Sequence, residues 1–137
     1  MIVAIDTLSP LPLYEQLRNQ IVLGVASKKL ALGEALPSVR RLAADLGINF
    51  HTVNKSYNML CDEGYLVVDR RKGALVSYTL DNGPDYQAEL SQKLILTAAE
   101  AICHGIDEKE FSRLCAKYYQ YALGKSENAL SNEEEDV

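Results

Sequence analysis

Residues 36–60 read LPSVRRLAADLGINFHTVNKSYNML, and this stretch decides which fold the chain adopts. Its first part has apolar residues at the spacing of one helix face, namely Val39, Leu42, Ala43 and Leu46. Ser38 stands directly before them, where a helix N-cap belongs. Gly47 follows them, and glycine ends helices readily because it takes the left-handed conformation without strain. The pattern therefore predicts a short helix over residues 39–46.

A second helix is predicted to follow at once. Asn49 is a suitable N-cap for it, and Glu63-Gly64 ends it. Its apolar face consists of Val53, Tyr57, Leu60 and Cys61. The two helices are joined by a turn of about four residues centred on Gly47-Ile48, which is the arrangement of a helix-turn-helix.

The flanking residues complete the domain. An earlier amphipathic helix is predicted from the four-residue spacing of Leu13, Leu17, Ile21 and Val25. Two β-prone runs, 65–68 and 74–78, flank the basic segment DRRKG at 69–73 and predict a hairpin. We therefore expect a mainly α fold with a small β-hairpin wing, in which residues 1–80 form a winged helix-turn-helix domain.

Charge divides the chain into two parts. The 137 residues carry a net charge of −5, which at first argues against a nucleic-acid partner. Residues 1–80, however, hold nine Lys/Arg against seven Asp/Glu, whereas residues 81–137 hold five against twelve. The turn-forming residues 81–84 separate the two parts. The acidity therefore belongs to the second part, and the first is mildly basic.

The basic and polar residues of the first part fall where a winged helix touches DNA. A helix fits the major groove, and a neighbouring wing reaches the flanking backbone. The candidate DNA-binding residues are Arg40, Arg41, Asn49, His51, Thr52, Asn54, Lys55, Arg70, Arg71 and Lys72. Each cluster alone would be an ordinary solvated surface, and His51 alone would be a surface or packing histidine. Their conjunction favours double-stranded DNA as the partner.

Residues 85–124 predict two further helices that form a dimerisation region. Gly105 separates the helices, and Asp107 with Glu110 has capping-box spacing at the start of the second. The candidate interface residues are Leu90, Leu94, Ala98, Ile102, Phe111, Leu114 and Tyr118. Two short helices cannot bury so wide an apolar face alone, so a second copy of the chain is expected to cover it. Residues 125–137 are expected to be a disordered acidic tail.

Other classes of function find less support. There is no Gly-rich phosphate loop, nucleophile elbow or HExxH motif, so we expect no catalytic residues and no enzyme. Cys103, His104 and Cys115 suggest a metal site, but small buried cysteines are the simpler interpretation, and no metal or cofactor is expected. The sequence leaves open whether the protein binds a small-molecule effector. Three cysteines, with neither a signal peptide nor a membrane span, indicate the reducing cytoplasm.

The sequence resembles the GntR family of bacterial transcription regulators. The resemblance rests on residues 12–17 (PLYEQL), 36–43 (LPSVRRLA), 46–49 (LGIN), 52–57 (TVNKSY), 63–66 (EGYL) and the wing, and it covers roughly residues 10–78. The short helical C-terminal part resembles the YtrA-type subfamily. The resemblance implies a repressor-type regulator that binds a pseudo-palindromic operator as a homodimer. The family's DNA contacts would fall on Arg40, His51, Thr52, Asn54, Lys55, Arg70 and Lys72.

Some positions depart from the family pattern. Many members have arginine where this chain has Phe50 and Asn54, so the operator sequence is not predicted. Phe50 is explained either by packing or by contact with a thymine methyl group. Arg41 stands where a glutamate is common, and Arg71 where a glycine is common. The alternative function is a winged-helix protein-interaction or RNA-binding module without operator specificity.

Overall fold

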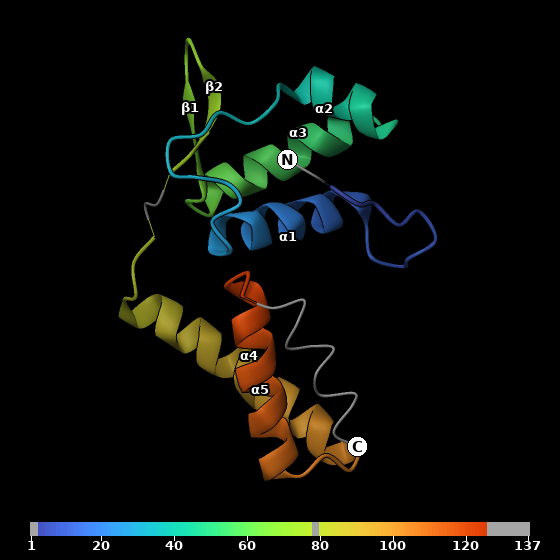
Figure 1. The fold of residues 1–137 in the computed structure, drawn as a ribbon, viewed down its shortest axis with the longest axis vertical. Coiled ribbons are helices and arrows are strands. Elements are labelled where there is room, and N and C mark those ends of the chain that lie inside the picture. Colours follow the sequence, from blue (N-terminus) through green and yellow to red (C-terminus); the bar gives the residue numbers. More distant parts are fainter. Residues whose placement is uncertain (1–2, 78–79, 126–137) are drawn as a thin grey trace. The chain divides into compact units, whose positions relative to one another are not determined.

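The computed structural model describes residues 3–77 and 80–125, and the chain divides into two compact units at Leu80–Asp81 (Figure 1). The first unit contains α1 (Leu13–Ala26), α2 (Val39–Leu46), α3 (Phe50–Asp62), β1 (Leu66–Asp69) and β2 (Gly73–Val76). The second contains α4 (Pro84–Cys103) and α5 (Glu108–Ala122). The prediction of a mainly α fold with a β-hairpin wing and a two-helix C-terminal segment is confirmed.

Local capping sets the ends of α2 and α3. The Ser38 hydroxyl accepts a hydrogen bond from the backbone N–H of Arg41 at 3.1 Å. The Asn49 side-chain oxygen accepts one from the backbone N–H of His51 at 2.8 Å. Gly47 ends α2 with a φ of 67°, the left-handed conformation that glycine adopts most readily. These contacts confirm both predicted caps and the predicted turn.

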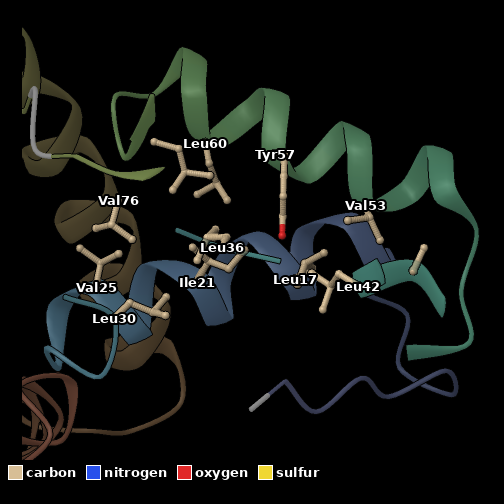
Figure 2. Close-up of a cluster of buried hydrophobic side chains, with 12 residues drawn as sticks. Leu17, Ile21, Val25, Leu30, Leu36, Leu42, Val53, Tyr57, Leu60 and Val76 are labelled. Atoms are coloured by element: carbon tan, nitrogen blue, oxygen red, sulfur yellow. The ribbon is translucent and has the colours of Figure 1, made fainter. Parts of the chain in front are cut away.

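The core of the first unit lies between α1 and α3 and is closed by α2 and the wing (Figure 2). It consists of Leu17, Ile21, Val25, Leu30, Leu36, Leu42, Ala43, Val53, Tyr57, Leu60, Leu66 and Val76. The apolar faces predicted for the three helices supply most of these residues. Cys61, placed on the α3 face by its spacing, is half-buried and packs at the edge of the core.

Two hydroxyl groups of α3 bind carbonyl groups outside that helix. The Ser56 hydroxyl, fully buried, donates to the Tyr14 carbonyl of α1 at 2.7 Å and also lies 3.3 Å from the carbonyl of Thr52. The Tyr57 hydroxyl donates to the Pro37 carbonyl, just before α2, at 2.7 Å. Buried polar groups of this kind need such partners, because an unpaired one costs about 1–3 kcal/mol. The two bonds fix α3 against both neighbouring helices.

An ion pair joins the middle of α1 to the C-terminal end of α3. The Arg18 guanidinium pairs with the Glu63 carboxylate, with its Nε 3.1 Å from Oε2, and lies 5.5 Å from the centre of the Tyr65 ring. Both charged side chains are partly shielded from solvent. The pair therefore adds to the packing that orients α3.

The wing is an antiparallel pair whose register runs from Leu66 opposite Val76 to Asp69 opposite Gly73. The loop before α2 extends this sheet, since the N–H of Leu36 donates to the Ala74 carbonyl at 2.8 Å. The second strand ends at Val76, two residues before the predicted end, and Tyr78 lies outside the described residues. The predicted wing is thus confirmed, with a shorter second strand.

The second unit is a pair of helices with little of their own core. Gly105 turns the chain with a φ of 84°, and the Asp107 carboxylate accepts from the Glu110 N–H at 2.9 Å. Glu110 itself turns forward to Arg113, at 2.6 Å, so the capping contact is made from the Asp107 side. Within residues 84–103 and 108–122, all of them described, no residue is buried. The tail predicted at 125–137 lies outside the described residues except for Lys125.

The buried phenol of Tyr57 predicts a distinct alkaline transition. Burial raises the pKa of Tyr57 to about 12, because the phenolate is disfavoured away from water. In the unfolded chain this phenol loses its proton near pH 10, whereas in the folded chain it keeps the proton until about pH 12. The free energy of unfolding therefore falls as pH rises from about 10 to 12. At full extent the loss is about 2–3 kcal/mol. We expect Tyr57→Phe to be about 1 kcal/mol less stable near neutral pH, through loss of the Pro37 bond, and to lose less stability above pH 10.

Urea unfolding of both chains between neutral pH and pH 12 measures this difference. Tyr86→Phe is the matched control, because Tyr86 is exposed on α4 and should leave the pH profile unchanged. Identical pH profiles for Tyr57→Phe and the original chain would contradict the assignment.

Candidate nucleic-acid interface

The start of α3 presents polar side chains at the surface because the apolar residues of this helix face the core. His51 and Lys55 are exposed, and Thr52 and Asn54 are half-buried on either side of the buried Val53. A helix with this division offers hydrogen-bond donors and acceptors along one side of its first two turns. It is the N-terminal part of a recognition helix that contacts base edges in helix-turn-helix proteins.

Asn49 has a structural task as well as the predicted contact with DNA. Its side-chain oxygen is occupied as the N-cap of α3, where it holds the N–H of His51. The same amide keeps two N–H donors on its nitrogen. The residue therefore orients the first turn of α3, and its side-chain NH2 group is available to donate to DNA.

The two arginines of α2 have different surroundings. Arg40 is exposed, and its guanidinium carbon lies 5.3 Å from the centre of the Phe50 ring at the start of α3. Arg41 is exposed as well, and its Nε lies 3.8 Å from the Asp45 carboxylate one turn further along α2. Arg40 therefore stands next to the surface of α3, whereas Arg41 stays along its own helix.

Lys55 rests on an aromatic ring of α1. Its ammonium nitrogen lies 3.8 Å from the centre of the Tyr14 ring, well within the range of a cation–π contact. The contact limits the freedom of a long side chain that would otherwise move in solvent. Sequence reasoning did not single out Tyr14 for this role, because the two residues are far apart in the chain and only the packing of α3 on α1 brings them together.

The wing tip is held by a carboxylate. One oxygen of Asp69 accepts from the backbone N–H groups of Lys72 at 2.9 Å and Arg71 at 2.8 Å. These bonds hold the pKa of the Asp69 carboxyl below its usual range, with the Lys72 bond as the larger cause. Gly73 closes the turn with a φ of 80°. The exposed side chains of Arg70, Arg71 and Lys72 thus stand on an ordered turn.

The structure brings the candidate residues together in two groups. Arg40 and the start of α3 form one group, linked through Phe50, while the wing tip forms the other. Figure 1 shows the wing projecting away from α1, to the side of that helix on which α2 lies. Asp69 and Tyr14 are the residues that sequence reasoning did not place in the site, whereas for Phe50 it left packing and contact with a thymine methyl group as alternatives. For Asp69 a signal existed, since aspartate often starts a turn by binding the backbone ahead of it.

Other kinds of site are less evident in the described parts of the chain. Within residues 3–77 and 80–125 no three His, Cys, Asp or Glu side chains gather as metal ligands would. Cys103 and Cys115, expected to be buried, are exposed, because the apolar face of α4 and α5 is uncovered in the single chain. None of the described helices has the length and apolarity needed to cross a bilayer.

A short recognition helix held by three-helix packing, with a basic wing, defines a winged helix-turn-helix protein of the DNA-binding class. The comparisons with known proteins agree. The family model described as "Bacterial regulatory proteins, gntR family" matches residues 12–76. The solved structure of YtrA from Sulfolobus acidocaldarius, a GntR-family transcription factor, is 38% identical, with 74% of this chain and 99% of that chain covered and a TM-score of 0.61.

Two further relatives extend the comparison. The structure of a transcriptional antiterminator from Listeria monocytogenes EGD-e is 30% identical, with 90% of this chain and 93% of that chain covered and a TM-score of 0.82. The HTH-type transcriptional repressor YtrA of Bacillus subtilis (strain 168) is 36% identical over 75 residues, which are 55% of this chain and 58% of that protein. The chain thus spans less than two thirds of the length of this curated relative.

The chain belongs to the GntR family of DNA-binding transcription regulators, and within that family it resembles the YtrA proteins.

Proposed function

We propose that the protein is a transcriptional repressor that binds a pseudo-palindromic operator as a homodimer in the cytoplasm. The proposal rests on how α3 divides its residues between the core and the surface. Its apolar residues are locked in the core, so His51, Thr52, Asn54 and Lys55 are presented together at the surface. No cofactor is required for this function.

Each part of the surface suits a different feature of DNA. Side chains of the size of His51, Thr52 and Asn54 can exchange hydrogen bonds with base edges in the major groove, where each base pair shows a distinct pattern. Arg40, Arg41 and Lys55 would bind phosphates beside the helix, and the cations on the ordered wing turn would bind phosphates of the flanking backbone. In this assignment base contacts give specificity, and phosphate contacts give most of the affinity.

The second unit supports assembly with a second copy. Of the predicted interface residues, Leu94, Ile102 and Tyr118 are 50%, 70% and 52% exposed. The others, Leu90, Ala98, Phe111 and Leu114, are half-buried. Helices that bury no residue gain too little from their own packing to be stable. The same surface on a second chain covers both copies at once, in a two-fold arrangement.

A dimer with two-fold symmetry is expected to bind a DNA site with the same symmetry. Two α3 helices related by such an axis reach successive major grooves about 34–36 Å apart, so the operator has the form of a pseudo-palindrome. A bound dimer occupies that DNA and blocks its use by other proteins. The repressor named among the relatives, YtrA of Bacillus subtilis, supports this sign of regulation.

The wing predicts a measurable salt dependence. The full chain is first used to select a duplex from a random library. The variant Arg70→Ala/Lys72→Ala should then bind both the selected duplex and unrelated duplexes more weakly than the original chain does. The slope of log affinity against log salt should become shallower by about 0.9 for each phosphate contact removed. Fluorescence anisotropy of labelled duplexes over a series of salt concentrations measures both effects.

Lys29→Ala/Lys109→Ala is the matched control, because it removes the same charge from exposed positions outside the candidate surface. Equal losses for the two double variants would show that net charge alone matters. A library that yields no enriched sequence would refute operator specificity and favour a module that binds protein or RNA.

The dimer predicts a mass of twice the 15.2 kDa chain. Leu94→Glu should give a monomer, because it places a charge in the apolar surface that a second copy covers. Leu8→Glu, at a side chain 93% exposed in the first unit, should leave the dimer intact. Sedimentation equilibrium at micromolar concentration distinguishes these states. A monomeric original chain would refute the role given to α4 and α5.

A further inference from the structure

We propose that Phe50 determines specificity by placing its ring against the C5-methyl group of a thymine in each half of the operator. This inference deepens the proposed function and rests on it. It assigns a reading role to the one large apolar side chain at the start of α3, and it assigns to Arg40 the role of positioning that ring.

The first argument is the exposure of Phe50. The residue is 38% exposed and does not belong to the core or to the partly buried apolar residues packed against it. A single exposed apolar side chain is ordinary on a protein surface and by itself proves nothing. Here, however, it is the first residue of α3, between Asn49 and His51, at the helix end that enters the major groove.

The second argument is that the ring is held in place. The Arg40 guanidinium carbon lies 5.3 Å from the ring centre, and the His51 ring meets the Phe50 ring nearly at right angles, with 5.6 Å between centres. Both geometries are favourable for an aromatic ring. A ring fixed by neighbours from α2 and α3 loses little freedom on binding DNA, so its contact costs less to form.

The third argument is chemical complementarity. Thymine is distinguished in the major groove by its C5-methyl group, an apolar group among polar base edges. The polar neighbours Asn49 and His51 can satisfy hydrogen-bonding edges, but neither can replace the apolar contact. A phenylalanine ring meets the methyl group without leaving a polar atom unpaired. Arg40 on the same ring brings a positive charge next to that thymine, towards the adjacent phosphate.

Replacement of thymine by deoxyuridine tests this assignment, since deoxyuridine still pairs with adenine and lacks the methyl group. The probe is the duplex enriched from a random library by the full chain, with its thymines replaced one at a time. At one position in each half-site the affinity should fall about fourfold, the factor that corresponds to burying one methyl-sized group. Phe50→Ala should bind the thymine and deoxyuridine duplexes equally at that position.

Two further variants separate reading from folding. Phe50→Leu keeps an apolar side chain and should retain part of the methyl dependence. Leu32→Ala shortens an apolar side chain that is 64% exposed outside the candidate surface and should keep the full dependence. Arg40→Ala should weaken binding to both duplexes, and more strongly to the thymine duplex, so that the methyl effect becomes smaller.

The outcomes distinguish this inference from the function on which it rests. An enriched duplex whose affinity is indifferent to every deoxyuridine overturns the reading role of Phe50 and leaves operator binding intact. Methyl dependence that persists unchanged in Phe50→Ala overturns it as well. Failure of the library to yield any enriched sequence overturns operator binding and, with it, this inference.

Discussion

The packing of α3 against α1 is the constraint on which the rest of the first unit depends. Val53, Tyr57 and Leu60 of α3 are buried against the core, and the Ser56 and Tyr57 hydroxyls bind carbonyl groups of other elements. Apolar burial favours the contact but leaves rotation possible, whereas a hydrogen bond to a fixed carbonyl specifies one orientation. That orientation determines which residues of α3 reach the surface, and therefore which residues can meet DNA.

Aromatic rings then order two of the charged side chains that the packing exposes, and a carboxylate orders the backbone turn that carries the others. Arg40 lies against Phe50, Lys55 lies against Tyr14, and Asp69 holds the turn that carries the wing cations. Long cationic side chains lose about 2 kcal/mol of rotamer entropy when they are fixed. Contacts made before DNA arrives reduce that loss at the moment of binding. The side chains of the proposed interface are thus positioned before DNA binds, mostly by residues that are not themselves expected to contact bases.

Local features of the fold could be predicted from the sequence, and distant pairs could not. The caps at Ser38 and Asn49 and the turn at Gly47 depend on neighbouring residues, so their signals are short. The Lys55–Tyr14 and Arg18–Glu63 contacts join residues that are far apart in the chain and follow from helix packing alone. Asp69 also had a local signal, since aspartate often starts a turn, but the sequence pattern of three adjacent cations indicated only the charge of the wing and not the carboxylate that holds its turn. The DNA contacts and the dimer interface remain predictions.

The backbone amide shifts of the chain on titration with a selected duplex test the central claim most directly. We predict that the largest changes fall on residues 50–55 at the start of α3 and on residues 70–72 at the wing tip. The amides of α4 and α5 should change little, because those helices are assigned to assembly. Changes concentrated in α4 and α5, with the start of α3 unaffected, would contradict the account.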